Sequence, residues 1–210
     1  MLIIYTDGSS LGNPGPGGWA AVIKDDNNNI TEISGGFKYT TNNRMELLGV
    51  IESLKFAEKN NEKQITIMTD SQLICNAINK GWLDKWQKGN WKKSDGKKVL
   101  NIDLWEKLIQ LLKNKNVIFN WIAGHSGIPG NERCDTLCKI AAEKATDIDF
   151  NYVENNTEKE SNMQNTQNLF VAATKIIKSK CKNYEMRILE KNILIYDSKG
   201  NKIMEFLNQI

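Results

Sequence analysis

Residues 2–23 read LIIYTDGSSLGNPGPGGWAAVI and combine a buried strand with an unusual loop. Leu2 to Tyr5 is a continuous apolar and β-favouring run, which is the pattern of a strand covered on both faces. Asp7 closes this run, and five glycines and two prolines follow before Trp19. A carboxylate in front of such a loop either forms a turn or belongs to a functional site.

The elements on either side of this loop predict an α/β fold. Strands are expected over about 2–7, 19–25 and 30–38, and their short connections make them antiparallel neighbours. Helical spacing of apolar residues predicts a helix over 42–60, and QITIMTD at 64–70 is a second buried strand. Helices over 71–80, 101–113 and 131–145, with a strand over 116–123, place parallel strands beside the first one. The prediction is a mixed five-stranded sheet, three strands antiparallel and two parallel, flanked by helices.

Composition places the chain among ordinary soluble proteins. Its 210 residues are 40% hydrophobic and 25% charged, with a net charge of +3. The N-terminal apolar run is too short for a signal peptide, and no stretch is long enough for a membrane span. The four cysteines lack zinc or redox spacing, and there is one histidine. We therefore expect a cytoplasmic protein with reduced thiols and no membrane association.

Two aspartates end neighbouring buried strands in this prediction. If the strands ending in Asp7 and Asp70 are parallel neighbours, both carboxylates point into one crevice at the edge of the sheet. Two carboxylates held together repel each other unless a cation neutralises them. Mg²⁺ is the natural candidate, because it is a hard ion that prefers carboxylate oxygen.

Two further acids could join this pair: Glu46 falls in the first turn of its predicted helix, and Asp135 lies one turn into the last predicted helix. Each of the four also has a structural alternative. Asp7 could belong to an Asp-Gly turn, and Glu46 could form a capping box with Asn43. Asp70 could be a helix N-cap, and Asp135 could be a plain surface residue. Taken singly, the structural alternatives are favoured.

The stretch KGWLDKWQKGNWKKSDGKK at 80–98 concentrates positive charge. Its seven lysines and two aspartates give it +5, so the rest of the chain carries −2. It also holds Trp82, Trp86 and Trp91. The alternatives are a solvated loop whose tryptophans tuck into the core, and a surface where rings and ammonium groups bind nucleic acid.

Four motifs together resemble type 1 ribonuclease H of the bacterial kind. They are YTDGSSLGNPGPGGW, TTNNRMEL, TDSQ and GHSGIPGNERCD, in that family's order and spacing over residues 1 to about 146. The resemblance implies an endonuclease that cuts the RNA strand of RNA/DNA hybrids, leaving 5′-phosphate and 3′-hydroxyl ends. It implies two Mg²⁺ ions, with Mn²⁺ as a possible substitute, held by Asp7, Glu46, Asp70 and Asp135. It also makes His125 a catalytic residue on a glycine-rich loop.

The resemblance further implies contacts with the hybrid. Ser10, Asn13, Asn42 and Gln72 match the residues that contact the RNA strand, and Thr41 and Asn101 match a pocket for a DNA phosphate. The basic protrusion of many bacterial members is matched by Trp82, Lys85, Trp86, Lys88, Lys92 and Lys93. Two rival functions remain: a hybrid-binding module without catalysis, which would lack a metal-binding acid, and a nuclease or transposase of the same fold acting on DNA.

The last 60 residues match no family that we identify. Residues 1–150 are expected to form the catalytic domain and the polar stretch 151–167 a linker. Residues 168–210 are expected to form a small α+β module with a helix over about 169–183 and three short strands. We expect a monomer, with association through this C-terminal module as an alternative.

Overall fold

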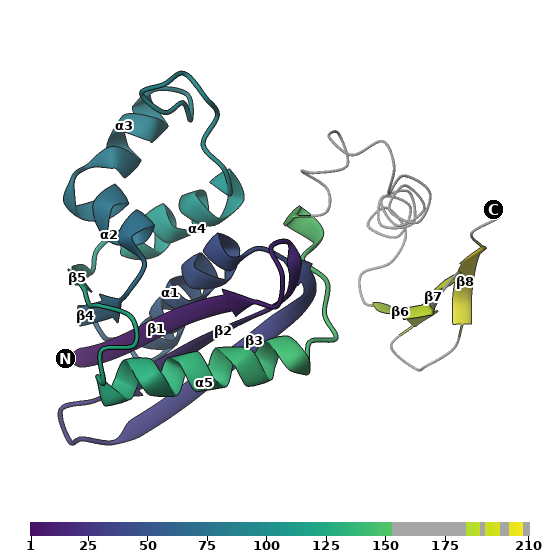
Figure 1. The fold of residues 1–210 in the computed structure, drawn as a ribbon, viewed down its shortest axis with the longest axis horizontal. Helices are drawn as coiled ribbons and strands as arrows, with labels where there is room; N and C mark the ends of the chain where they lie inside the picture. Colours follow the sequence, from purple (N-terminus) through teal and green to yellow (C-terminus); the bar gives the residue numbers. More distant parts are fainter. Residues whose placement is uncertain (153–183, 190–191, 198–201, 208–210) are drawn as a thin grey trace. The chain divides into compact units, whose positions relative to one another are not determined.

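The computed structural model describes residues 1–152, 184–189, 192–197 and 202–207. The chain falls into two compact units, Met1–Asp149 and Phe150–Ile210, which are described separately (Figure 1). Within the described residues, every helix is too short or too polar to cross a membrane.

The first unit is built on a mixed five-stranded sheet. Its strands are β1 (Leu2–Ser10), β2 (Gly15–Lys24), β3 (Ile30–Thr40), β4 (Gln64–Thr69) and β5 (Asn116–Trp121), in the order β3-β2-β1-β4-β5. β1, β2 and β3 pair antiparallel, whereas β4 pairs parallel with both β1 and β5. The predicted sheet is therefore confirmed, including the parallel pairing of the strand that contains Asp7 with the strand that precedes Asp70.

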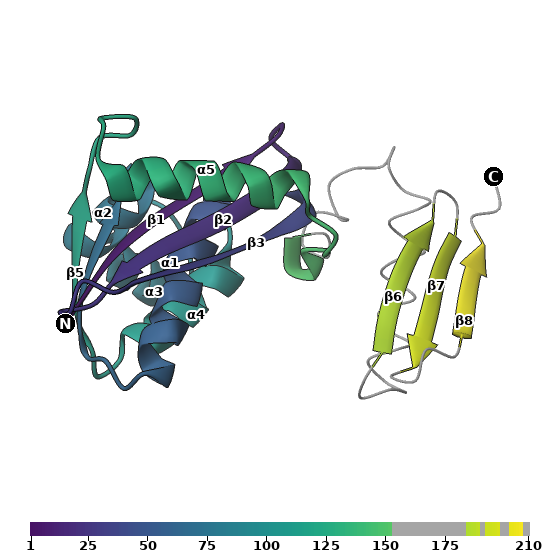
Figure 2. The same ribbon diagram turned by 90° about the horizontal axis from the view of Figure 1, so that it is seen from below.

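Helices cover both faces of this sheet (Figure 2). They are α1 (Asn42–Lys59), α2 (Gln72–Asn79), α3 (Trp82–Lys88), α4 (Ile102–Leu112) and α5 (Pro129–Glu143). α5 packs over β1, β2 and β3, and α1 packs on the opposite face with α4 against it. The main core lies between the sheet and α1, where Ile4, Leu47, Ile51 and Ile67 are fully buried.

Two local features differ from the sequence prediction. β1 runs three residues further than expected, because Gly8, Ser9 and Ser10 continue to pair with β2. Asp7 therefore lies inside a strand and not at its tip. The basic stretch contains α3, a helix that we did not predict. Leu83 and Trp86 on this helix are buried. The Trp86 ring packs edge-on against Trp105 of α4, with 5.5 Å between the ring centroids.

The described strands of the second unit form a three-stranded antiparallel sheet. β6 (Tyr184–Leu189), β7 (Asn192–Asp197) and β8 (Lys202–Leu207) occur in that order, as the sequence predicted. The predicted helix at 169–183 lies outside the described residues. So does the predicted linker, except for residues 151 and 152, which are helical.

Candidate active site

The four acids come from four elements that meet near the middle of the sheet. Asp7 lies in β1, Asp70 follows β4, Glu46 is in α1 and Asp135 is in α5. In the parallel pairing of β1 and β4, Thr6 lies opposite Thr69. Asp7 and Asp70 each follow one of these paired residues, so the register itself brings the two aspartates side by side.

Two glycines allow the helices to reach this point. A Cβ on Gly8 would overlap the backbone of Met45 and Glu46 in α1, and a Cβ on Gly18 would overlap the Cys138 carbonyl in α5. Only a residue without a side chain permits such close approach. The glycines on either side of the β1–β2 turn therefore bring Glu46 from one face and Asp135 from the other toward Asp7.

The structural alternatives for three of the acids do not hold. Asp7 is part of β1 and forms no Asp-Gly turn. The N-cap of α1 is Thr41, not Asn43, which excludes the capping box for Glu46. The N-cap of α2 is Ser71, whose hydroxyl accepts a hydrogen bond from the Ile74 amide, so Asp70 is not the cap.

Neighbouring polar groups hold each carboxylate in place. The Gly8 amide donates to Asp7 Oδ1 at 2.7 Å. Glu46 accepts hydrogen bonds from Asn42 Nδ2 at 2.8 Å and from the Ser71 hydroxyl. Lys139 Nζ lies 2.7 Å from Asp135 Oδ2, one helical turn away. Asp135, for which a plain surface residue was the structural alternative, is 19% exposed and ion-paired.

Asp70 is held by residues from the following segments. The Asn131 side chain in α5 hydrogen-bonds to its carboxylate, and Trp121 Nε1 donates to its backbone carbonyl at 3.0 Å. Asn131 is buried, and within the described part of the chain its Oδ1 has no hydrogen-bond partner. Asn131 was not among the predicted site residues, although it lies within the quoted GHSGIPGNERCD motif.

Burial and mutual repulsion raise the pKa values of these acids. Desolvation, followed by the charge of Asp70, raises the pKa of Asp7 to about 6. Desolvation, with the charges of Asp70 and Asp7, raises the pKa of Glu46 to about 7. The pKa of Asp70 is also raised, chiefly by desolvation. Carboxylates gathered in this way need a cation to stay ionised near neutral pH.

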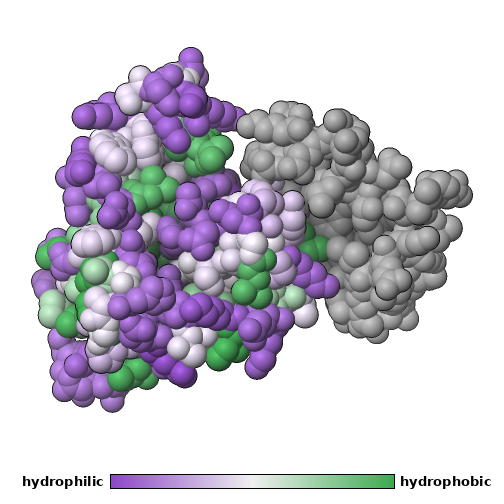
Figure 3. Space-filling model, viewed as in Figure 1, coloured by the Kyte–Doolittle hydropathy of each residue, from purple (hydrophilic) through white to green (hydrophobic). Residues whose placement is uncertain are grey.

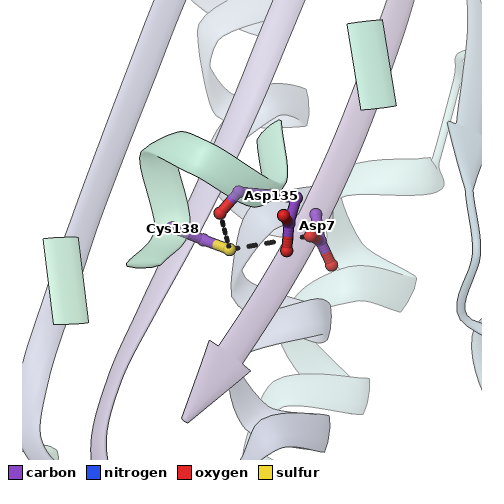
Figure 4. A group of neighbouring side chains, drawn as sticks. All are labelled: Asp7, Asp135 and Cys138. Carbon is purple, nitrogen blue, oxygen red and sulfur yellow. Dashed lines mark hydrogen bonds between the residues drawn. The ribbon is translucent and has the colours of Figure 1, made fainter. Parts of the chain in front are cut away.

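Asp7 and Asp135 offer neighbouring carboxylate oxygens to a divalent cation, and a thiol lies beside them. One oxygen from each of Asp7 and Asp135 and the sulfur of Cys138 lie within 4.8 Å of one another (Figure 4). The Cys138 sulfur lies 3.6 Å from Asp7 Oδ2 and 3.2 Å from the Asp135 carbonyl. Cys138 was not predicted at this site, although its position one turn after Asp135 on a helix places both on one face.

The predicted RNA-strand contacts lie near these acids along the chain. Asn13 Oδ1 accepts a hydrogen bond from the Asn42 amide at 3.3 Å, which links the β1–β2 turn to the start of α1. Ser10 ends β1, and the exposed Gln72 begins α2 directly after Asp70 and Ser71. His125 is exposed in the loop between β5 and α5, where its charged form would favour ionisation of Asp70.

The two residues of the expected phosphate pocket both stand at helix N-termini. Thr41 is the N-cap of α1 and Asn101 the N-cap of α4, and neither side chain caps its own helix. Arg44 Nη1 donates to Asn101 Oδ1 at 3.4 Å and so connects the two helices. Helix N-termini carry partial positive charge and present backbone N–H groups, which suits an anion.

The basic protrusion is separate from the acids. The helix α3 carries Trp82, Lys85 and Lys88, and the loop after it carries Lys92 and Lys93. All four lysines are exposed. The surface over this part of the molecule is predominantly hydrophilic (Figure 3). Trp86 is only 8% exposed, so for this residue the alternative of a tryptophan tucked into the core fits better than a nucleic-acid contact.

Sequence comparisons with known proteins all identify the same family. The RNase H family model matches residues 1–143. A protein named Ribonuclease H from Nitratidesulfovibrio vulgaris (strain DP4) is 51% identical over 143 residues, which are 68% of this chain and 90% of that protein. Ribonuclease H from Proteus mirabilis (strain HI4320) is 45% identical over 159 residues, covering 74% and 96% of the two chains.

Solved structures with a similar fold belong to the same family as these sequence relatives. LC9-RNase H1, described as a type 1 RNase H with the type 2 active-site motif, superposes with a TM-score of 0.61 at 28% identity, covering 69% of this chain and 73% of that one. LC11-RNase H1 in complex with an RNA/DNA hybrid superposes with a TM-score of 0.53 at 27% identity, covering 69% and 98%.

Proposed function

Because the chain belongs to the ribonuclease H family, we propose that it hydrolyses the RNA strand of RNA/DNA hybrids at the site formed by Asp7, Glu46, Asp70 and Asp135. The observation that carries this assignment is the convergence of four carboxylates from four elements. The products expected from the family resemblance are 5′-phosphate and 3′-hydroxyl ends.

The family uses divalent metal ions, and we assign two Mg²⁺ ions to this site, with Mn²⁺ as a substitute. Bound ions of this kind would supply an activated water and charge stabilisation for the leaving oxygen. Asp7 would help to hold both ions, since it neighbours Asp70 through the strand register and has a carboxylate oxygen within 4.8 Å of an oxygen of Asp135. Glu46 and Asp70 would complete one position, and Asp135 the other.

The protein's own contribution is to hold these groups in place before substrate arrives. Asn42 and Ser71 fix both oxygens of Glu46, and Asn131 fixes the carboxylate of Asp70. Carboxylates locked by neighbours lose little conformational entropy on binding a cation. The raised pKa values of Asp7 and Glu46 mean that cation binding displaces protons near neutral pH.

His125 is assigned a supporting role in proton transfer or product release. It is exposed on the β5–α5 loop, on the side of Asp70. Histidine is the side chain that changes charge near neutral pH, so it suits a proton shuttle. His125→Ala should lower turnover without abolishing it, because activated water can still attack; complete inactivity would make His125 a ligand or an essential base.

Recognition of the hybrid is divided between the two strands. By the family resemblance, the residues that would contact the 2′-hydroxyls and backbone of the RNA strand, exposed in a shallow minor groove, are Ser10, Asn13, Asn42 and Gln72. The pocket of Thr41 and Asn101 would take a phosphate of the DNA strand. The lysines of the protrusion would add contacts that do not depend on base sequence.

One assay tests the proposed function directly. Labelled RNA/DNA hybrid, double-stranded RNA and duplex DNA are each incubated with the full chain, with Mg²⁺ and with chelator. We expect cleavage only of the RNA strand of the hybrid and only with the metal. Binding of the hybrid without cleavage would indicate a binding module, and cleavage of duplex DNA would indicate a different nuclease.

A further inference from the structure

Arg44 in α1 is buried between two carboxylates from distant parts of the chain. It is 2% exposed, and its guanidinium donates to Asp103 Oδ1 and Oδ2 at 2.9 Å each. It also donates through Nε and Nη2 to the two oxygens of Asp149, at 2.6 and 2.8 Å. Asp103 lies in the first turn of α4, whereas Asp149 follows α5. Arg44 therefore joins three segments through paired, charge-assisted hydrogen bonds.

The same guanidinium sets the orientation of the Asn101 amide. Arg44 Nη1 lies 3.4 Å from Asn101 Oδ1, a long hydrogen bond. A guanidinium has donors only, so the amide must present its oxygen to Arg44 and direct its NH₂ group to the other side. An anion such as phosphate requires donors. Because Arg44 occupies the oxygen of the Asn101 amide, the NH₂ group is the end of this side chain that stays available to an anion.

Asp149 also contacts the residue next to Thr41, which is the other residue of the expected phosphate pocket. Its Oδ2 accepts a hydrogen bond from the Thr40 hydroxyl at 2.8 Å, and Thr40 immediately precedes Thr41. Thr40 is fully buried and Asp149 is 5% exposed, so this contact is shielded from solvent. One carboxylate therefore restrains Thr41 through the backbone and Asn101 through Arg44.

We propose that Arg44 and Asp149 are positioning residues for the pocket that binds a phosphate of the DNA strand. This inference rests on the proposed function, since it requires Thr41 and Asn101 to contact the hybrid. Asp149 lies beyond residues 1–143, the segment that the family model matches. Asp149, between α5 and the second unit, would then influence hybrid binding through Arg44 and Thr40.

Asp149→Asn tests this role. The substitution keeps the shape of the side chain but removes one of the two charges that hold Arg44. We expect the KM for hybrid to rise about tenfold, the effect of losing a hydrogen bond to a charged group. Turnover at saturating hybrid should remain nearly unchanged, because the four acids are not altered. Glu32→Gln is the control, since it removes an exposed ion pair with Arg133 and leaves this network intact.

A double-mutant cycle with Asn101→Ala decides whether Asp149 acts through the pocket. If it does, Asp149→Asn raises KM by a smaller factor in the Asn101→Ala background than in the wild-type background, because only the contact through Thr40 to Thr41 is left to lose. Additive effects, an unchanged KM or a fall in turnover alone would overturn the positioning role. If Asn101→Ala itself leaves KM unchanged, the pocket assignment fails, while cleavage of the RNA strand still stands or falls by the substrate assay.

A milder variant guards against a general loss of folding. Thr40→Val removes only the hydroxyl that donates to Asp149 and leaves both ion pairs of Arg44 in place. Its melting temperature should remain close to that of the parent, and its KM should rise by a smaller factor than that of Asp149→Asn. An unchanged KM in a folded Thr40→Val protein would show that the hydrogen bond from Thr40 to Asp149 does not position Thr41.

Discussion

Gly8 of β1 lies directly against the backbone of Glu46 in α1, with no space for a side chain between them. This contact sets how closely one metal-binding acid approaches the strand that carries another. Gly8→Ala would force α1 away from the sheet and move Glu46 relative to Asp7. We expect destabilisation of about 1–3 kcal/mol, typical of overpacking, together with a large loss of turnover.

The measurement for Gly8→Ala combines thermal unfolding with cleavage of hybrid at saturating Mg²⁺. Activity that falls far more than stability, with the protein still folded at the assay temperature, supports a geometric role for this glycine. A variant with unchanged stability and turnover would show that α1 can move without affecting the site.

Asp70→Asn should abolish cleavage and leave the fold and hybrid binding almost intact, because it removes a ligand's charge without changing its shape. The charge of Asp70 also contributes to the raised pKa values of Asp7 and Glu46. The substitution should therefore lower both pKa values, which carboxyl carbon NMR titration can follow. Substantial residual cleavage would contradict the ligand assignment, and unchanged pKa values would contradict the coupling.

Stability without metal should decrease as pH rises. The folded-state pKa values of Asp7 and Glu46 are raised to about 6 and about 7, so the folded protein holds these protons more tightly than the unfolded chain. Their contribution to stability is fully present below the ordinary carboxyl pKa of about 4 and is lost as pH rises through 6 and 7.

Thermal unfolding in chelator from pH 5 to pH 8 checks this sign. Glu46→Gln should flatten the decline, because its neutral amide cannot lose a proton over this range. Saturating Mg²⁺ should also reduce the decline, since it stabilises the ionised carboxylates. A melting temperature that rises across this range in chelator would contradict the raised pKa values.

Much of the site followed from local sequence patterns, because strand and helix periodicities define which elements carry the acids. The parallel pairing of β1 with β4, which sets Asp7 beside Asp70, was anticipated from two buried runs whose connection includes the helix α1. The length of β1 did not follow, because the glycines after Asp7 indicate a turn when they are read without their partner strand. In the structure their missing side chains serve close packing against α1 and α5.

The features that sequence reasoning missed depend on contacts between distant residues. Arg44 and Asp149 are 105 positions apart, and no periodicity links them. α3 was obscured because the charge of its stretch favoured a loop, although Trp82, Leu83 and Trp86 have helical spacing. Two of these three are buried, which shows that the protrusion is anchored to the core by its apolar side chains.

Neutralising the exposed lysines of the protrusion should weaken hybrid binding and flatten its dependence on salt. Every phosphate that the protein no longer neutralises takes about 0.9 off the slope of log affinity against log salt on a duplex. Turnover at saturation should change little, because these residues are remote from the acids. The residues to replace together with glutamine are Lys85, Lys88, Lys92 and Lys93.

The matched control replaces four lysines elsewhere on the first unit, so that the change in net charge is the same. Lys24 and Lys59 lie at the ends of β2 and α1, Lys63 precedes β4, and Lys113 follows α4. We expect the control to keep most of the salt slope. If the slope falls equally in both quadruple variants, the effect comes from net charge and the protrusion is not a binding element.

The boundary of the catalytic unit can be located through Asp149. A chain ending at Tyr152 retains every element of the first unit and the partners of Arg44, so it should fold and cleave hybrid. A chain ending at Thr146 keeps the whole segment that the family model matches but leaves Arg44 with one carboxylate fewer. Breaking a buried ion pair by removing one partner costs about 3–5 kcal/mol.

Comparing the melting temperatures of the two shortened chains with that of the full chain therefore decides whether the unit ends before or after Asp149. The chain ending at 152 should melt close to the full protein, and the chain ending at 146 well below it. Arg44→Met in the shorter chain should recover part of the stability, because it removes the buried charge that has no second partner there. Equal melting of both shortened chains would show that Asp149 contributes little to the stability of this unit. An inactive or insoluble chain ending at 152 would show instead that the second unit is required for the catalytic fold.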